Sequence, residues 1–146
     1  MKTIALRYAD HFAPVGGTIK AHEELIKKNG FVWYGKIGIG ISENTRRLIM
    51  SNSPALILLV HSGCFDRYWA TISDIKKEIP EEKFIPGYYK DKYDKVGVWF
   101  CVTRFQKASS NVLSKCKLIS SGKTLTEASR KCMNPMFIIE CMEFEK

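Results

Sequence analysis

The chain has 146 residues, of which 45% are hydrophobic and 26% charged, values typical of a single globular domain spanning residues 1–146. Its longest apolar run, residues 55–60, is too short to cross a bilayer, and Arg7 and Asp10 interrupt the N-terminal segment before a signal peptide could form. The net charge of +8 favours a polyanionic partner. We therefore expect a cytoplasmic protein without a membrane partner.

The first half of the chain predicts one strand and two helices. Residues 3–8 form a short apolar strand, and a pair of glycines then breaks the chain. A helix can run over Thr18–Asn29 with its first residue as the N-cap and Gly30 as a left-handed C-cap. His22 lies on the inner face of this helix, where we expect a hydrogen-bonded packing residue. A glycine-rich turn and a second helix, Glu43–Met50, follow.

The second half of the chain is rich in strands. Residues 76–94 form a long charged loop, which is unusual in a small domain unless it has a function. Five or six strands with long loops and few helices predict an α+β fold, a small mixed β-barrel or a strongly curled sheet with flanking helices. We expect strands over residues 55–61, 67–75, 96–105, 112–119 and 137–144, and a short capped helix over residues 124–132.

Motifs for metals, phosphates and cofactors are incomplete. Residues 121–124 (SGKT) resemble the end of a P-loop, but that motif needs a glycine where the chain has Lys117. Residues 38–40 (GIG) lack the third glycine and the βαβ unit of a dinucleotide site, so we interpret them as a turn. The five cysteines contain no CxxC pair and the three histidines are scattered. We therefore expect reduced cysteines, no disulfide, no metal and no cofactor.

One strand end carries residue types that can perform nucleophilic chemistry. His61 closes an apolar strand, and Ser62, Cys64 and Asp66 follow it. Residues this close in sequence diverge around a turn, and nucleophilic sites depend on a geometry that spacing does not show. We therefore interpret this segment as a strand-end turn that contributes His61 and Ser62 to ligand binding.

Several aromatic residues are candidates for stacking on an unpaired base. Trp33 lies between a helix and a glycine-rich turn. Tyr88 and Tyr89 lie in the long loop, and Tyr93 ends that loop just before a strand. Aromatic faces within a basic surface are typical of proteins that bind unpaired bases. A core position is an equal alternative for Trp33, and we expect the mid-strand Trp69 and Trp99 to lie in the core.

The order of these segments resembles the YTH and EVE families of the PUA-like superfamily. Residues 27–34 (KKNGFVWY) are similar to their helix end and GVW turn, and residues 55–75 to their central hairpin. Residues 91–99 (DKYDKVGVW) resemble the segment with the second aromatic wall and a core Trp, and residues 111–135 the late connection with an Asn-Pro pair. The resemblance covers nearly the whole chain. It implies a PUA-like barrel with a pocket for one flipped or unpaired base, which in these families is often methylated.

The resemblance also implies roles for individual residues. Trp33 and Tyr93 would form the two walls of the pocket, although readers of methyladenine usually have Trp at both positions. The backbone of Tyr34 would hydrogen-bond the edge of the base. The remaining candidate ligand-binding residues are Arg7, Lys36, His61, Ser62 and Asn134.

Three functions remain open from the sequence. A nucleic-acid-binding module would hold a base of single-stranded RNA or DNA. A small hydrolase similar to the ASCH family would act on a nucleoside-like amide, with Lys36 as the reactive group assisted by Glu43 or Asp66. A domain that binds a small molecule or nucleotide would use the same pocket without a polymer. We expect the first, a binding module rather than an enzyme, and the sequence does not specify its oligomeric state.

Overall fold

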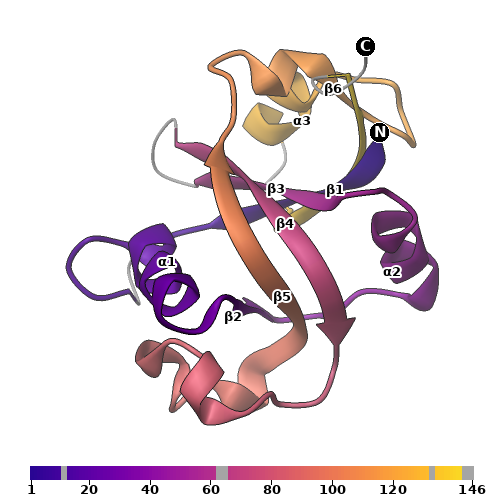
Figure 1. Cartoon of the computed structure of the whole chain (residues 1–146). Coiled ribbons are helices and arrows are strands. Elements are labelled where there is room, and N and C mark those ends of the chain that lie inside the picture. Colours follow the sequence, from indigo (N-terminus) through magenta and orange to yellow (C-terminus); the bar gives the residue numbers. More distant parts are fainter. Residues whose placement is uncertain (11–12, 62–65, 132–133, 143–146) are drawn as a thin grey trace.

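The computed structural model describes the chain except residues 11–12, 62–65, 132–133 and 143–146. Its seven strands are β1 (Lys2–Tyr8), β2 (Val32–Ile37), β3 (Ala55–His61), β4 (Arg67–Lys76), β5 (Val96–Lys107), β6 (Cys116–Leu118) and β7 (Met136–Cys141). They form one mixed sheet in the order β2-β5-β4-β3-β1-β7-β6 (Figure 1). β1 and β3 are parallel, and every other neighbouring pair is antiparallel.

The sheet confirms the α+β class and corrects two details of the prediction. The structure has seven strands, rather than five or six, and one of them is β2, which continues through residues expected to belong to a glycine-rich turn. Within the described residues no ladder joins β2 to β6, so the sheet is open and not closed into a barrel. Register shifts around Ile72 mark bulges between β4 and β5, which bend these long strands across the molecule (Figure 1).

The helix α1 (Thr18–Asn29) has the predicted bounds but a different N-terminal cap. Gly17 holds the N-cap position, and the Thr18 amide donates a hydrogen bond to Oδ1 of Asp10 at 2.9 Å. The cap is therefore a carboxylate from the end of β1, which also suits the positive end of the helix dipole. At the other end, Gly30 is left-handed with φ of 89°, as predicted.

Helices cover both faces of the sheet. On one face, α1 and α2 (Glu43–Met50) pack Ile19 and Ile49 onto the strands. On the other face lie the 3-10 turn η4 (Val112–Lys115) and α3 (Leu125–Lys131), the latter burying Leu125 and Ala128 (Figure 1). The strand expected over residues 112–119 is thus a turn followed by the short β6. Since β3 lies between both layers, its apolar run is buried almost throughout.

A third group of buried side chains lies under the loop between β4 and β5. This loop contains three short turns, η1 (Glu82–Phe84), η2 (Gly87–Tyr89) and η3 (Tyr93–Lys95). We call the group the aromatic cluster, and its buried members are Trp33, Ile85, Tyr89, Trp99 and Cys101. Trp69 and Trp99 are core residues, as predicted, with exposed fractions of 1% and 0%.

Glycines hold the turn over residues 38–40 tightly against β5. A Cβ atom at Gly97 would overlap the Gly38 carbonyl oxygen and the Gly40 amide nitrogen. Gly38 is left-handed with φ of 96°, and its amide donates to the Lys95 carbonyl oxygen at 2.9 Å. These glycines therefore form a tight turn, as predicted, and not part of a dinucleotide site.

Candidate functional site

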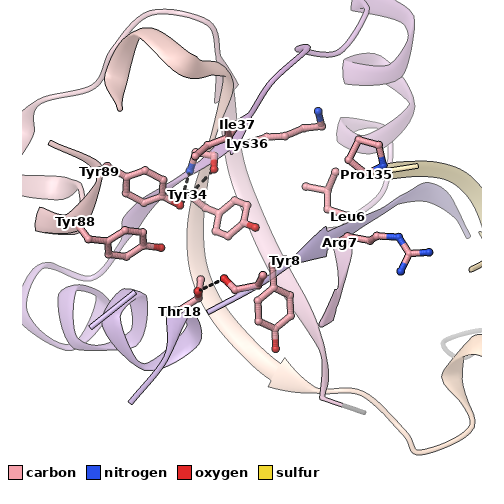
Figure 2. Close-up of a pocket in the computed structure, with 12 residues that line it drawn as sticks. Leu6, Arg7, Tyr8, Thr18, Tyr34, Lys36, Ile37, Tyr88, Tyr89 and Pro135 are labelled. Carbon is pink, nitrogen blue, oxygen red and sulfur yellow. Dashed lines mark hydrogen bonds between the residues drawn. The ribbon is translucent and has the colours of Figure 1, made fainter. Parts of the chain in front are cut away.

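A cavity of about 240 Å³ lies between the end of β1, the start of α1, the strand β2 and the turn η2 (Figure 2). Four tyrosines line it, and Leu6, Ile37 and Pro135 add apolar surface. Pockets for drug-sized ligands measure roughly 300–1,000 Å³. The cavity therefore fits one compact ring system better than a large cofactor. The four tyrosines are Tyr8, Tyr34, Tyr88 and Tyr89.

The tyrosine walls combine flat apolar faces with neutral hydroxyl groups. The rings of Tyr88 and Tyr89 stack with centroids 4.5 Å apart, and Figure 2 shows both on one side of Tyr34, with Arg7 on the other. Burial raises the pKa of Tyr34, Tyr88 and Tyr89, so all three phenols are protonated at neutral pH. Protonated phenols can both donate and accept hydrogen bonds. The walls thus suit a planar ring with polar edges.

The Tyr89 hydroxyl lies at the free edge of β2. It is 3.3 Å from the amide nitrogen and 3.3 Å from the carbonyl oxygen of Gly35 (Figure 2). In an antiparallel pair the main-chain groups of successive residues alternate in direction, so those of Tyr34 face β5. The main-chain groups that border the cavity are therefore those of Gly35, one residue beyond the predicted Tyr34.

His22 lies fully buried under this edge and is uncharged. Its Nδ1 lies 2.8 Å from the Thr18 carbonyl oxygen and its Nε2 3.4 Å from the Tyr89 hydroxyl. Because a carbonyl oxygen can only accept, Nδ1 carries the proton and Nε2 can accept from Tyr89. Burial lowers the pKa of His22 to about 4. The prediction of a hydrogen-bonded packing histidine is confirmed.

Two cationic residues line the cavity, and main-chain carbonyl groups hold both of them. Arg7 donates from Nε to the Asn134 oxygen at 3.0 Å and from Nη2 to the Ser129 oxygen at 2.6 Å. Lys36 donates to the Ile39 oxygen, and burial lowers its pKa. Of the predicted ligand-binding residues, the structure thus brings Arg7, Lys36 and Asn134 to the region of the cavity, and Asn134 takes part through its main chain.

A histidine–aspartate pair lies next to the cavity. Nε2 of His61 is 2.7 Å from Oδ2 of Asp10, and the His61 ring meets the Tyr8 ring edge-on at 4.9 Å. Burial raises the pKa of Asp10, but hydrogen bonds from Thr18 and His61 outweigh it and lower the pKa overall. The pair joins the ends of β1 and β3. Ser62, the other ligand-binding residue predicted for this strand end, lies outside the described residues.

Trp33 and Tyr93, the two predicted walls, lie beside the cavity and are not among the described residues that line it. Trp33 is 8% exposed, and Nζ of Lys76 lies 4.8 Å from its ring centroid. Tyr93 is half-buried and meets Trp99 edge-on at 6.0 Å. Tyr89 connects the two regions, since it lines the cavity and belongs to the aromatic cluster. A ligand-binding role for Trp33 and Tyr93 stays a prediction.

Sequence reasoning assigned no binding role to nine of the twelve residues that line the cavity, and four of these nine have polar side chains: Tyr8, Thr18, Tyr88 and Tyr89. Tyr88 and Tyr89 stand out in the sequence as aromatic residues of an unusually long charged loop, but only Tyr93 of that loop was assigned to the predicted pocket. Tyr8 and Thr18 had no local signal. They reach the cavity only because β1 pairs in parallel with β3 and α1 docks beside it.

No helix in the described part of the chain is long and apolar enough to cross a membrane. The described residues also contain no group of three or more His, Cys, Asp or Glu side chains that could hold a metal ion.

Comparison with known proteins relates the chain to one family. A family model described as Pua-like matches residues 4–135. This stretch contains all the residues that line the cavity, from Leu6 to Pro135. Neither a curated protein nor a solved structure matches the chain.

Proposed function

Because the chain belongs to the Pua-like family, we propose that it binds nucleic acid by holding one unpaired or flipped base in the tyrosine-lined cavity. Pua-like domains commonly bind nucleic acids. The observation that carries the proposal is the cavity itself, which combines four tyrosines with Arg7 and Lys36. Methylated bases are among the candidate ligands, since the walls are largely apolar. In this proposal residues 1–146 form a single domain.

The proposed mechanism assigns stacking to the tyrosines and charge to the two cations. An aromatic ring stacks on any base, because every base has a flat face, and each stack contributes roughly 1–3 kcal/mol. Hydrogen bonds from the protonated phenols of Tyr34 and Tyr88 are available to the polar edge of the base. Arg7 and Lys36 lie where they can attract the phosphates on either side of it, in a protein of net charge +8.

A pair of tyrosine variants tests which aromatic groups bind the base. Tyr88→Ala removes a cavity wall, and we expect it to weaken the binding of labelled single-stranded RNA or DNA roughly ten- to hundredfold. The matched control is Tyr93→Ala, since Tyr93 is a half-buried tyrosine of the same loop that does not line the cavity. Equal losses in both variants, or a loss only in Tyr93→Ala, would contradict the cavity and support the pocket implied by the family resemblance.

Salt dependence separates a polymer from a free nucleotide as the ligand. Binding that neutralises several phosphates weakens steeply as salt rises, whereas binding of a nucleoside in the cavity does not. We expect a steep slope for single strands and weaker binding of duplexes. If nucleosides bind equally tightly and without salt dependence, the small-molecule function replaces the polymer. If no single strand binds at low salt, the nucleic-acid proposal fails.

The hydrolase alternative finds no support in the arrangement around Lys36. It needs Glu43 or Asp66 beside the lysine, but the Glu43 carboxylate lies within 3.7 Å of Arg46 and Arg47 on α2. Neither carboxylate is among the described residues that line the cavity. We therefore do not propose an amide hydrolase.

A further inference from the structure

We propose that Cys116 and Cys141 form a dithiol that an oxidant of the disulfide class converts to a cross-strand disulfide between β6 and β7. The two residues are directly opposite each other in the antiparallel ladder. Both side chains are fully buried and belong to the same core cluster beneath α3. The structure contains them as thiols.

The hydrogen bonds around the pair show which kind of ladder position it occupies. The Cys141 amide donates to the Met1 carbonyl oxygen at 2.7 Å, and the Cys141 carbonyl accepts from the Met1 nitrogen at 3.0 Å. Both main-chain groups of Cys141 thus face Met1 and not β6. On the β6 side the next hydrogen bond runs from the Met142 amide to the Lys115 oxygen at 3.1 Å. Cys116 and Cys141 are therefore a non-hydrogen-bonded pair.

That position suits a disulfide without movement of the backbone. Directly opposite residues of a non-hydrogen-bonded pair have Cα atoms about 4.5 Å apart, and their side chains lie closer than in the hydrogen-bonded kind. Disulfides join residues whose Cα atoms are about 4.4–6.8 Å apart. Cys101 offers an internal contrast, because its strand β5 is separated from β7 by β4, β3 and β1. At about 4.8 Å per strand, Cys101 is far beyond bonding reach.

The oxidation balances with glutathione disulfide as the oxidant. One cysteine thiolate attacks a sulfur of the oxidant, forms a mixed disulfide and releases one glutathione thiolate. The second cysteine thiolate then attacks the mixed disulfide, closes the Cys116–Cys141 bond and releases a second glutathione. The two protons lost by the cysteines end on the two glutathione thiolates, so two electrons pass from the protein to the oxidant.

Access to the buried thiols comes from local opening of β6. This strand has only three residues and lies at the edge of the sheet, so it belongs to the elements that open most easily. Buried thiols react slowly, and we expect oxidation over hours rather than seconds. Once formed, the bond closes a loop of about 25 residues and restricts the unfolded chain. The helix α3 packs against β6, so the disulfide would also hold in place the strand that this helix contacts.

The test uses the complete folded protein with glutathione disulfide, followed by alkylation, digestion and mass spectrometry. We expect a peptide pair linked through Cys116 and Cys141, and a roughly hundredfold smaller equilibrium constant of unfolding in urea. Dithiothreitol should reverse both effects. Cys101→Ala should form the same link, whereas Cys141→Ala should not.

Three results would overturn the proposal. The first is no link in the folded protein after prolonged oxidation. The second is a link to another cysteine in place of Cys116–Cys141. The third is a link that appears only in denaturant or lowers stability, because the folded geometry would then oppose it. The wild-type reaction decides the matter even if Cys141→Ala does not fold.

Discussion

Acid should destabilise this protein through His22. The folded protein holds the ring neutral with a pKa of about 4, whereas an unfolded chain has a histidine pKa near 6.5. Between these values the unfolded state binds a proton that the native state does not. The stability that depends on neutral His22 is therefore complete above about pH 6.5 and is lost as the pH falls toward 4. The difference of about 2.5 pKa units corresponds to about 3 kcal/mol.

The measurement is urea unfolding of the wild type and of His22→Gln between pH 7 and pH 4.5. The variant costs stability at every pH, because it loses the hydrogen bond to Thr18 and the ring contact with Tyr34. Only the wild type has the pH-dependent stability that comes from His22. The difference in the free energy of unfolding between the wild type and the variant should therefore shrink by about 2–3 kcal/mol as the pH falls. A difference in the free energy of unfolding that stays constant over this pH range would contradict a lowered pKa of buried His22.

Three further substitutions test the packing around the cavity. Tyr89→Phe leaves the polar groups at the edge of β2 unsatisfied and should cost about 2–4 kcal/mol in urea unfolding, whereas Tyr93→Phe should be nearly neutral. Trp33→Ala should cost about 3–5 kcal/mol because the side chain is 8% exposed in the aromatic cluster, and a stable variant that loses oligonucleotide binding would instead favour its predicted role as a wall. Gly97→Ala should lower stability by roughly 1–3 kcal/mol through overlap with the turn at residues 38–40. The control is Gly87→Ala, because a Cβ at Gly87 meets nothing within 4 Å. An equally small loss of stability in both variants would contradict the close approach of Gly97 to the turn.

Local signals in the sequence predicted most of the elements. The bounds of α1 and α2 and the left-handed Gly30 follow from helix periodicity and end residues, which act over a few positions. The apolar run of β3 likewise identifies a strand buried on both faces. The cap of α1 escaped prediction because Asp10 reaches Thr18 across a turn, and residue spacing does not specify such a contact.

The site was less predictable than the elements. Lys36 and Arg7 were identified, but the tyrosine walls come from the end of β1, from β2 and from the loop before β5. Which of those aromatic residues meet depends on strand order, and the pairing of β1 with β3 leaves no periodic trace in the chain. The open sheet was missed for the same reason. Closure depends on whether the first and last strands of the order meet, and the short β6 faces a turn instead.

The open sheet has two edges, and at each of them another part of the chain bonds main-chain groups that point outward. Exposed edges offer unpaired main-chain groups to other chains and are a common origin of aggregation. At β2 the outward groups of Gly35 are already bonded by the Tyr89 hydroxyl. At β6 the Leu118 amide donates to the Lys123 oxygen at 2.8 Å, and Lys117 forms a bridge with Thr124. A side chain at β2 and a turn at β6 thus occupy main-chain positions where an added strand would have to pair.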